Sequence, residues 1–277
     1  MAGSSTAYTL VALDLDGTAV RSDGDVSERL KEAVKECQRR HITVMLATGR
    51  MVQSAVPYWQ ALGLGEGPLV AYQGAVVAMM PEARIVEKTT LPQAGALAAV
   101  RWAIERGLLT QVYVGQELWI SREDPRARHY IEVNHIPGWV RGAHEIMDWP
   151  EPPIKVLLQD EGAVLDAIRG ELEQVVAPYP IRVFKSQTDY LEIVHDAVGK
   201  AKGVAEAARL LGIERQHVLT VGDAENDLDM LEWAGMGVAM GQAPDVVKRA
   251  ADAVTAAVDE DGAALALERF VLQMPVG

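Results

Sequence analysis

Short apolar segments alternate with amphipathic segments in the first third of the chain, and this alternation limits the possible folds more than any other feature. The apolar segments are residues 9–15, 42–47 and 69–71, and helical patterns occupy 27–40 and 51–62. The first segment is apolar without clean alternation, which is typical of a strand buried on both faces of a parallel sheet. The same order returns after residue 200. We therefore predict an α/β fold with a Rossmann-like parallel sheet and right-handed crossovers.

The order of segments changes between residues 87 and 187. Pro92 can begin a helix, and a pair of strand segments follows over residues 110–120. Strand pairs with helices between them indicate a separate α+β unit. We therefore expect a discontinuous core, residues 1–86 and 188–277, that is interrupted by an inserted α+β domain at residues 87–187.

The charge balance argues against nucleic acid as a partner. The chain has 26 Lys and Arg against 39 Asp and Glu, a formal net charge of −13. It has no basic cluster of the kind that binds nucleic acid. An acidic protein also weakly repels anionic substrates, so a phosphate site has to create its own local positive field.

The same sequence gives no sign of a membrane protein. No apolar run reaches the roughly 18–20 residues that span a bilayer. Residues 1–8 lack the basic start and the apolar stretch of a signal peptide. We therefore expect a cytoplasmic protein without membrane association, in an oligomeric state that the sequence leaves open. The single cysteine, Cys37, shares helical register with Leu30, Ala33 and Val34, so we expect a buried thiol and no disulfide.

The strongest candidate for a chemical site is Asp14-Leu15-Asp16-Gly17-Thr18, at the end of the first strand segment. Both carboxylates project to one side of a strand, because side chains alternate along it. Open α/β sheets bind ligands at the carboxyl ends of their strands, and carboxylate oxygens are ligands that Mg²⁺ prefers. One carboxylate can attack phosphorus while the other transfers a proton. The alternative is a solvated strand end with a turn at Asp16-Gly17.

A second candidate, Thr48-Gly49-Arg50, ends the second strand segment. A hydroxyl and free backbone amides before a helix can hold a phosphate, and Arg50 can add a charge-assisted contact. The alternative is ordinary strand-to-helix turn chemistry.

A third candidate, Gly222-Asp223-Ala224-Glu225-Asn226-Asp227, follows another apolar strand segment. Asp223 and Asp227 can converge on one cation, although Asp and Asn are also common helix caps. Lys200, at a predicted helix start, can neutralise a phosphate or be a solvated lysine, and Lys202 competes for that role. Taken together, separate strand-to-helix junctions carry acids or a hydroxyl at one edge of the predicted sheet, which folding alone does not require.

In this order the motifs resemble the haloacid dehalogenase superfamily of phosphatases, whose pattern is DxDGT, a strand-end threonine, a lysine and GDxxxD. The likeness is closer to the Cof-type branch, subfamily IIB, with a C2-type-B cap. It rests on Leu191-Glu192-Ile193 ahead of Lys200, on Val238-Ala239-Met240-Gly241 and on Asp261-Gly262. The resemblance covers nearly the whole chain and is weakest over residues 87–187, where the branch inserts its cap.

The resemblance implies a Mg²⁺-dependent phosphoric monoester hydrolase that acts on a small phosphorylated metabolite. It implies that Asp14 is the nucleophile and that Asp16 is first the acid and then the base. Mg²⁺ would be held by Asp14, Asp16 through its carbonyl, Asp223 and Asp227. The phosphoryl oxygens would be bound by Thr48, Gly49, Arg50, Lys200 and Asn226.

Three positions depart from the branch: Gln73 and Gln242 stand where asparagine is usual, and Ala201 where glycine is usual. None removes a catalytic group. Two alternative functions stay open, a sugar phosphomutase of the same superfamily and a phospho-accepting signalling protein. Asp16 argues against the signalling protein. Proton transfer by Asp16 would allow the phospho-aspartate to be hydrolysed, so that the protein turns over instead of keeping a stable phospho-aspartate. Sugar phosphates and cofactor phosphates are both open as substrates.

Overall fold

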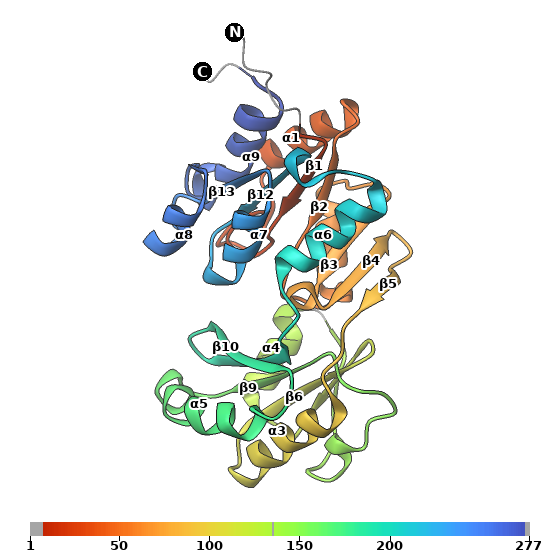
Figure 1. The fold of residues 1–277 in the computed structure, drawn as a ribbon, viewed down its shortest axis with the longest axis vertical. Helices are drawn as coiled ribbons and strands as arrows, with labels where there is room; N and C mark the ends of the chain where they lie inside the picture. The colour runs from red at the N-terminus through yellow and green to blue at the C-terminus, as the bar shows by residue number, and fades with distance from the viewer. Residues whose placement is uncertain (1–7, 135, 275–277) are drawn as a thin grey trace. The chain divides into compact units, whose positions relative to one another are not determined.

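The computed structural model describes residues 8–134 and 136–274 and divides the chain into two compact units. The first unit combines Met1–Glu87 with Gly199–Gly277, and the second is Lys88–Val198. The mixed α/β fold predicted from the sequence is confirmed (Figure 1). The second unit ends at Val198 instead of residue 187, because β11 (Tyr190–His195) pairs with two strands of that unit.

A five-stranded parallel sheet, in the order β14-β13-β12-β1-β2, forms the centre of the first unit. The strands are β1 (Leu10–Leu13), β2 (Thr43–Leu46), β12 (Val218–Gly222), β13 (Met236–Ala239) and β14 (Ala253–Val254). β1 lies between β12 and β2, and Leu13 is level with Val221 on one side and Leu46 on the other. β1 and β12 are wholly buried, as their unbroken apolar runs predict.

The third predicted strand belongs to a different sheet from the first two. β3 (Gly67–Ala71) forms a three-stranded sheet with β4 (Val76–Met80) and β5 (Arg84–Lys88), and it pairs antiparallel with β4. A bridge between Ala47 and Val70 joins it to the residue that follows β2. The residues that connect β3 to β4 are Tyr72–Gly74, a short 3-10 turn.

Two helices of the first unit have ends that are explained by a capping side chain or a glycine. The helices of this unit are α1 (Glu28–Arg39), α2 (Val52–Ala61), α6 (Lys200–Leu211), α7 (Leu228–Trp233), α8 (Asp245–Ala250) and α9 (Gly262–Ala266), the last followed by a π turn at Leu267–Val271. The Ser27 hydroxyl accepts from Leu30 N at 3.1 Å and so caps α1, as predicted. α6 ends at Gly212 in the left-handed conformation, φ 69°, which glycine adopts readily.

The second unit is built around a six-stranded sheet. Its strand order is β10-β11-β9-β6-β7-β8. The strands are β6 (Leu109–Val114), β7 (Glu117–Ile120), β8 (Gly138–Val140), β9 (Lys155–Gln159), β10 (Ile181–Gln187) and β11, and the helices are α3 (Gln93–Glu105), α4 (Pro125–Asn134) and α5 (Gly162–Val176). α3 and α5 share an apolar core with one face of the sheet, including Val112, Val156 and Ile193.

The other face of this sheet carries buried polar groups. Lys155 and Glu192 form an ion pair at 2.9 Å, with only 2% and 5% of their side chains exposed. The Lys155 ammonium also lies 4.6 Å from the centre of the Tyr113 ring, and the Ser186 hydroxyl donates to Glu192 at 2.9 Å. Burial disfavours the Lys155 ammonium, but the neighbouring Glu192 carboxylate outweighs it and raises the lysine pKa.

Within residues 8–134 and 136–274, no helix is long and apolar enough to cross a lipid bilayer. The cytoplasmic location stays a prediction.

Cys37 provides a test of the packing of α1. The side chain is fully buried, and burial raises the pKa of its thiol to about 12. At pH 8 the folded protein should therefore hold on the order of a thousandfold less thiolate than an ordinary cysteine. We expect no reaction with Ellman's reagent in buffer and one equivalent in urea. Rapid labelling of the folded protein would contradict the buried position.

The Lys155–Glu192 ion pair predicts that removing one charge destabilises the protein more than removing both. Lys155→Met should lower the free energy of unfolding by about 3 kcal/mol or more, because it leaves the Glu192 charge buried and unpaired. Adding Glu192→Leu should restore most of that loss, since neither charge then needs a partner. Urea unfolding followed by tryptophan fluorescence measures both. A double variant as unstable as the single one would show that lost packing, and not the unpaired charge, is responsible.

Candidate active site

The carboxyl ends of β1, β2 and β12 lie side by side, and each is followed by a candidate residue. Asp14 follows β1, Thr48 follows β2 across Ala47, and Asp223 follows β12. Because β1 lies between the other two strands in matching register, these side chains belong to one edge of the sheet. The sequence predicted this shared edge.

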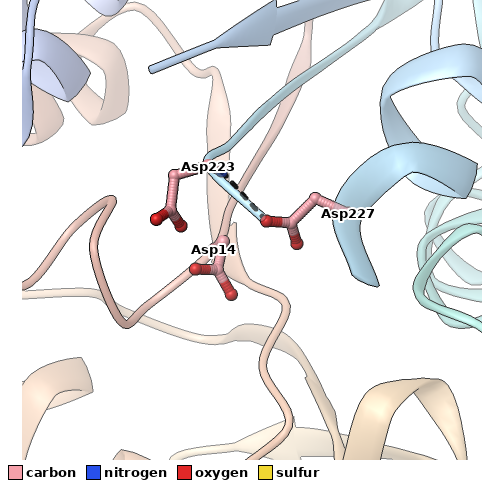
Figure 2. Close-up of side chains that lie close together, drawn as sticks. All are labelled: Asp14, Asp223 and Asp227. Carbon is pink, nitrogen blue, oxygen red and sulfur yellow. Dashed lines mark hydrogen bonds between the residues drawn. The ribbon is translucent and has the colours of Figure 1, made fainter. Parts of the chain in front are cut away.

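Three carboxylates converge at this edge, those of Asp14, Asp223 and Asp227 (Figure 2). Each offers an oxygen, and the three oxygens lie within 4.8 Å of one another. Asp227 is fully buried, and its Oδ2 accepts from the backbone N–H groups of Asp223 and Ala224, both at 3.0 Å. The turn after β12 therefore holds Asp227 in place. A divalent cation requires oxygen donors of this kind, so the set fits one.

Lys200, the first residue of α6, places its ammonium among these acids. The side chain is fully buried and forms ion pairs with Asp14 and, at 2.5 Å, with Asp227. Burial disfavours the charged lysine, but the carboxylates of Asp14 and Asp227 outweigh it and hold the lysine pKa above its ordinary value. Lys200 therefore stays charged, and the competing residue Lys202 is not part of this contact.

One ammonium does not offset three carboxylates. Burial, followed by repulsion from Asp227, raises the pKa of Asp14 well above its usual range. The same two causes raise the pKa of Asp223 to about 6, although the Thr18 hydroxyl donates to it at 3.2 Å. The site thus holds more negative charge than the chain itself neutralises, and a bound cation would relieve that excess.

Asp16 lies outside the carboxylate triad and pairs with Arg50. The guanidinium donates to both Asp16 oxygens, at 2.6 Å and 2.9 Å, in a bidentate contact. Half of the Asp16 side chain is exposed, whereas the Arg50 side chain is mostly buried and lies 5.1 Å from the centre of the Tyr58 ring. Asp16 was predicted as a metal ligand through its carbonyl and as the acid and base through its side chain, and Arg50 as a phosphate ligand. The two side chains contact each other in this structure, and the predicted contacts stay predictions.

Thr48, Gly49 and Asn226 lie in the two loops that flank this edge. Thr48 is buried, and its hydroxyl accepts from the Arg50 backbone N–H at 3.1 Å. The Asn226 amide donates to the Gln73 side chain at 3.0 Å. A side chain at position 49 would meet the Gln73 amide, which would then have to move.

Two contacts at the site have no signal in the sequence pattern. The Asp229 carboxylate accepts from Ala201 N at 3.2 Å and so caps the start of α6 beside Lys200. The Gln242 amide donates to the Gly17 carbonyl at 2.6 Å, while its oxygen accepts from Val258 N at 3.0 Å. Both join segments far apart in the chain. The position of Asp229 just after Asp227 could have drawn attention to it, and Gln242 was noted only as a departure from the asparagine usual in the branch.

Comparisons with known proteins agree with this geometry. The family model described as haloacid dehalogenase-like hydrolase matches residues 11–267. The chain is 29% identical to the 5-amino-6-(5-phospho-D-ribitylamino)uracil phosphatase YitU of Bacillus subtilis, over 94% of this chain and 97% of that protein. A solved haloacid dehalogenase-like hydrolase from Bacteroides thetaiotaomicron is 31% identical, with a TM-score of 0.85 over 95% of this chain and 99% of the other.

The fold is also that of a sugar phosphatase, BT4131, of subclass IIB of this superfamily. Its structure matches with a TM-score of 0.83 at 22% identity, over 95% of this chain and 98% of that one. The resemblance to the haloacid dehalogenase superfamily read from the motifs is confirmed.

The raised carboxylate pKa values predict how metal binding depends on pH. Mg²⁺ and protons compete for Asp14 and Asp223, and the pKa of Asp223 is raised to about 6. Mg²⁺ should therefore raise the thermal unfolding temperature at pH 8, and its affinity should fall about tenfold per pH unit for each proton displaced below about pH 6.

Differential scanning fluorimetry of chelator-treated protein with and without Mg²⁺ measures this stabilisation. Sodium chloride at matched ionic strength is the control, and Asp223→Asn should remove the Mg²⁺ effect. A stabilisation that is equal at pH 5 and pH 8 would argue against these carboxylates as the ligands.

Proposed function

Because this chain belongs to the haloacid dehalogenase-like hydrolases, we propose that it hydrolyses a small phosphate monoester through a phospho-aspartate on Asp14. The family and the relatives make it a phosphatase of small phosphorylated compounds. One observation carries the finer proposal, the pairing of the buried Lys200 ammonium with Asp14 at the end of the central strand. It gives this carboxylate a fixed position and a cation beside it.

In the first step, a carboxylate oxygen of Asp14 attacks phosphorus and the bond from phosphorus to the ester oxygen breaks. Asp16 is a carboxylate paired with Arg50 in the structure, so it first takes up a proton from solvent and then gives it to the departing alcohol. In the second step, water attacks the phospho-aspartate, Asp16 takes the proton from that water, and the bond from Asp14 to phosphorus breaks. Inorganic phosphate leaves, and both aspartates return to their starting state.

Asp16 is suited to this exchange because of where its side chain lies. It is half exposed, whereas Asp14 is buried, so it can meet a leaving group and water from the solvent side. The contact from Arg50 fixes the direction of the Asp16 carboxylate. Protonation of Asp16 weakens that ion pair and leaves the guanidinium able to contact a phosphoryl oxygen.

The transferred phosphoryl group carries negative charge that the site has to neutralise. Lys200 offers its ammonium, Thr48 its hydroxyl, Asn226 its amide, and Gly49 its backbone N–H. Asp14, Asp223 and Asp227, with the Asp16 carbonyl, would hold Mg²⁺. When bound, the cation would neutralise the phosphoryl oxygens and the carboxylate excess.

The proposed substrate class is sugar phosphates and cofactor phosphates. The name of the Bacillus relative describes a phosphorylated ribityl compound, and the structural relative is named a sugar phosphatase. We also propose that the inserted domain, residues 87–187, selects the substrate. The discontinuous core, residues 1–86 and 188–277, then carries out catalysis.

The reaction is tested by release of inorganic phosphate from a panel of sugar and cofactor phosphates. Wild type should turn over at least one member with Mg²⁺ and none with chelator. Asp14→Asn should lower kcat by at least about a thousandfold, since it removes the attacking group. Asp245→Asn, the same change at an exposed position on α8, is the matched control and should keep full activity.

The same assay separates the hydrolase from a phosphomutase. Glucose and mannose phosphates are followed for isomerisation as well as for phosphate release. Isomerisation without release would replace the hydrolase by a mutase, and no reaction from a folded, Mg²⁺-bound protein would refute the phosphatase proposal.

A further inference from the structure

The turn between β3 and β4 has an unusual backbone. Tyr72, Gln73 and Gly74 all have positive φ, at 51°, 59° and 94°. Glycine adopts this region readily, whereas each of the two preceding residues is strained there by about 1 kcal/mol or more. Such strain persists only where surrounding contacts compensate for it.

The backbone of this turn contacts residues of the candidate active site or their neighbours. Tyr72 N donates to the Arg50 carbonyl at 2.9 Å, and Gln73 N donates to the Thr48 carbonyl at 3.0 Å. Gly74 packs so closely on the Gly199 carbonyl that a side chain would collide with it. The turn is therefore fixed to the loop that carries Thr48 and to the residue that precedes Lys200.

The Gln73 side chain extends the same connection. It is 4% exposed, and its carbonyl oxygen accepts from the Asn226 amide at 3.0 Å. Its own amide nitrogen lies against Gly49. One buried carboxamide thus joins the loop after β2 to the turn after β12, the two loops that supply the proposed phosphate contacts.

We propose that Gln73 is a positioning residue that fixes the orientation of the Asn226 amide toward the phosphoryl group, an inference that rests on the proposed phosphatase function. A side-chain amide can rotate to present either its oxygen or its nitrogen. The Gln73 carbonyl can only accept, so it selects the orientation that presents nitrogen and commits one N–H. The second N–H remains a donor for an oxyanion. Without Gln73, the amide can present its oxygen to the phosphoryl group, which repels it.

A double-mutant cycle tests this role, with the inhibition constant of inorganic phosphate as its readout. Gln73→Leu removes the acceptor, and Asn226→Ala removes the oriented amide. Each single variant should raise the inhibition constant about ten- to a hundredfold, the value of one hydrogen bond to a charged group. The double variant should be no weaker than Asn226→Ala alone, because Gln73 acts through Asn226. Gln38→Leu, on α1, is the matched control and should leave the constant unchanged.

A merely structural role would give a different pattern. If Gln73 only stabilised the fold, the two changes would multiply in the double variant, or Gln73→Leu would lower the unfolding temperature without changing phosphate inhibition. Either result overturns the inference. Should Gln73→Leu fail to fold, Gln73→Gly replaces it in the cycle, because glycine adopts positive φ readily and has no carboxamide.

Failure of the inference is distinguishable from failure of the proposed function. A wild-type protein that turns over substrate while the cycle is additive overturns the role of Gln73 alone. A wild-type protein that neither releases phosphate from the panel nor binds inorganic phosphate by calorimetry overturns both.

Discussion

The buried ammonium of Lys200 is the interaction on which the rest of the site depends. Three carboxylates meet at the end of the central strand, and burial would make such a set of like charges strongly unfavourable without a counter-charge. Lys200 contacts two of them, Asp14 and Asp227. It can do so because α6 begins at this residue, where the Asp229 carboxylate caps the helix. The negative charge left over is what favours a divalent cation.

The surrounding loops are held by contacts between segments that are distant in sequence. Gln242 joins the loop after β1 to the segment before α9, and Gln73 joins the loop after β2 to the turn after β12. Two strained residues, Tyr72 and Gln73, are tolerated in that connection. Proteins keep such strain where geometry matters more than local stability. The second unit also has a buried contact between segments distant in sequence, the Lys155–Glu192 ion pair on its sheet.

Much of the fold was predictable because its signals are local. Unbroken apolar runs marked β1, β2 and β12, and Ser27 marked the start of α1. The sheet to which β3 belongs was not predictable, since a short apolar run does not say whether its partner is parallel or antiparallel. The end of the second unit had the same difficulty. Nothing in residues 190–195 reveals that β11 pairs with β9 and β10.

The sequence by itself determined which residue types stand at the strand ends, Asp14 and Asp16, Thr48, and Asp223 with Asp227, and that Lys200 begins a helix. Period and spacing fix these positions, and a shared sheet edge then brings the strand ends together. Only the tertiary structure decided which side chains touch. It paired Arg50 with Asp16, placed Lys200 on two acids, and joined Gln73 to Asn226. Such contacts depend on distances across the folded core, which no local pattern encodes.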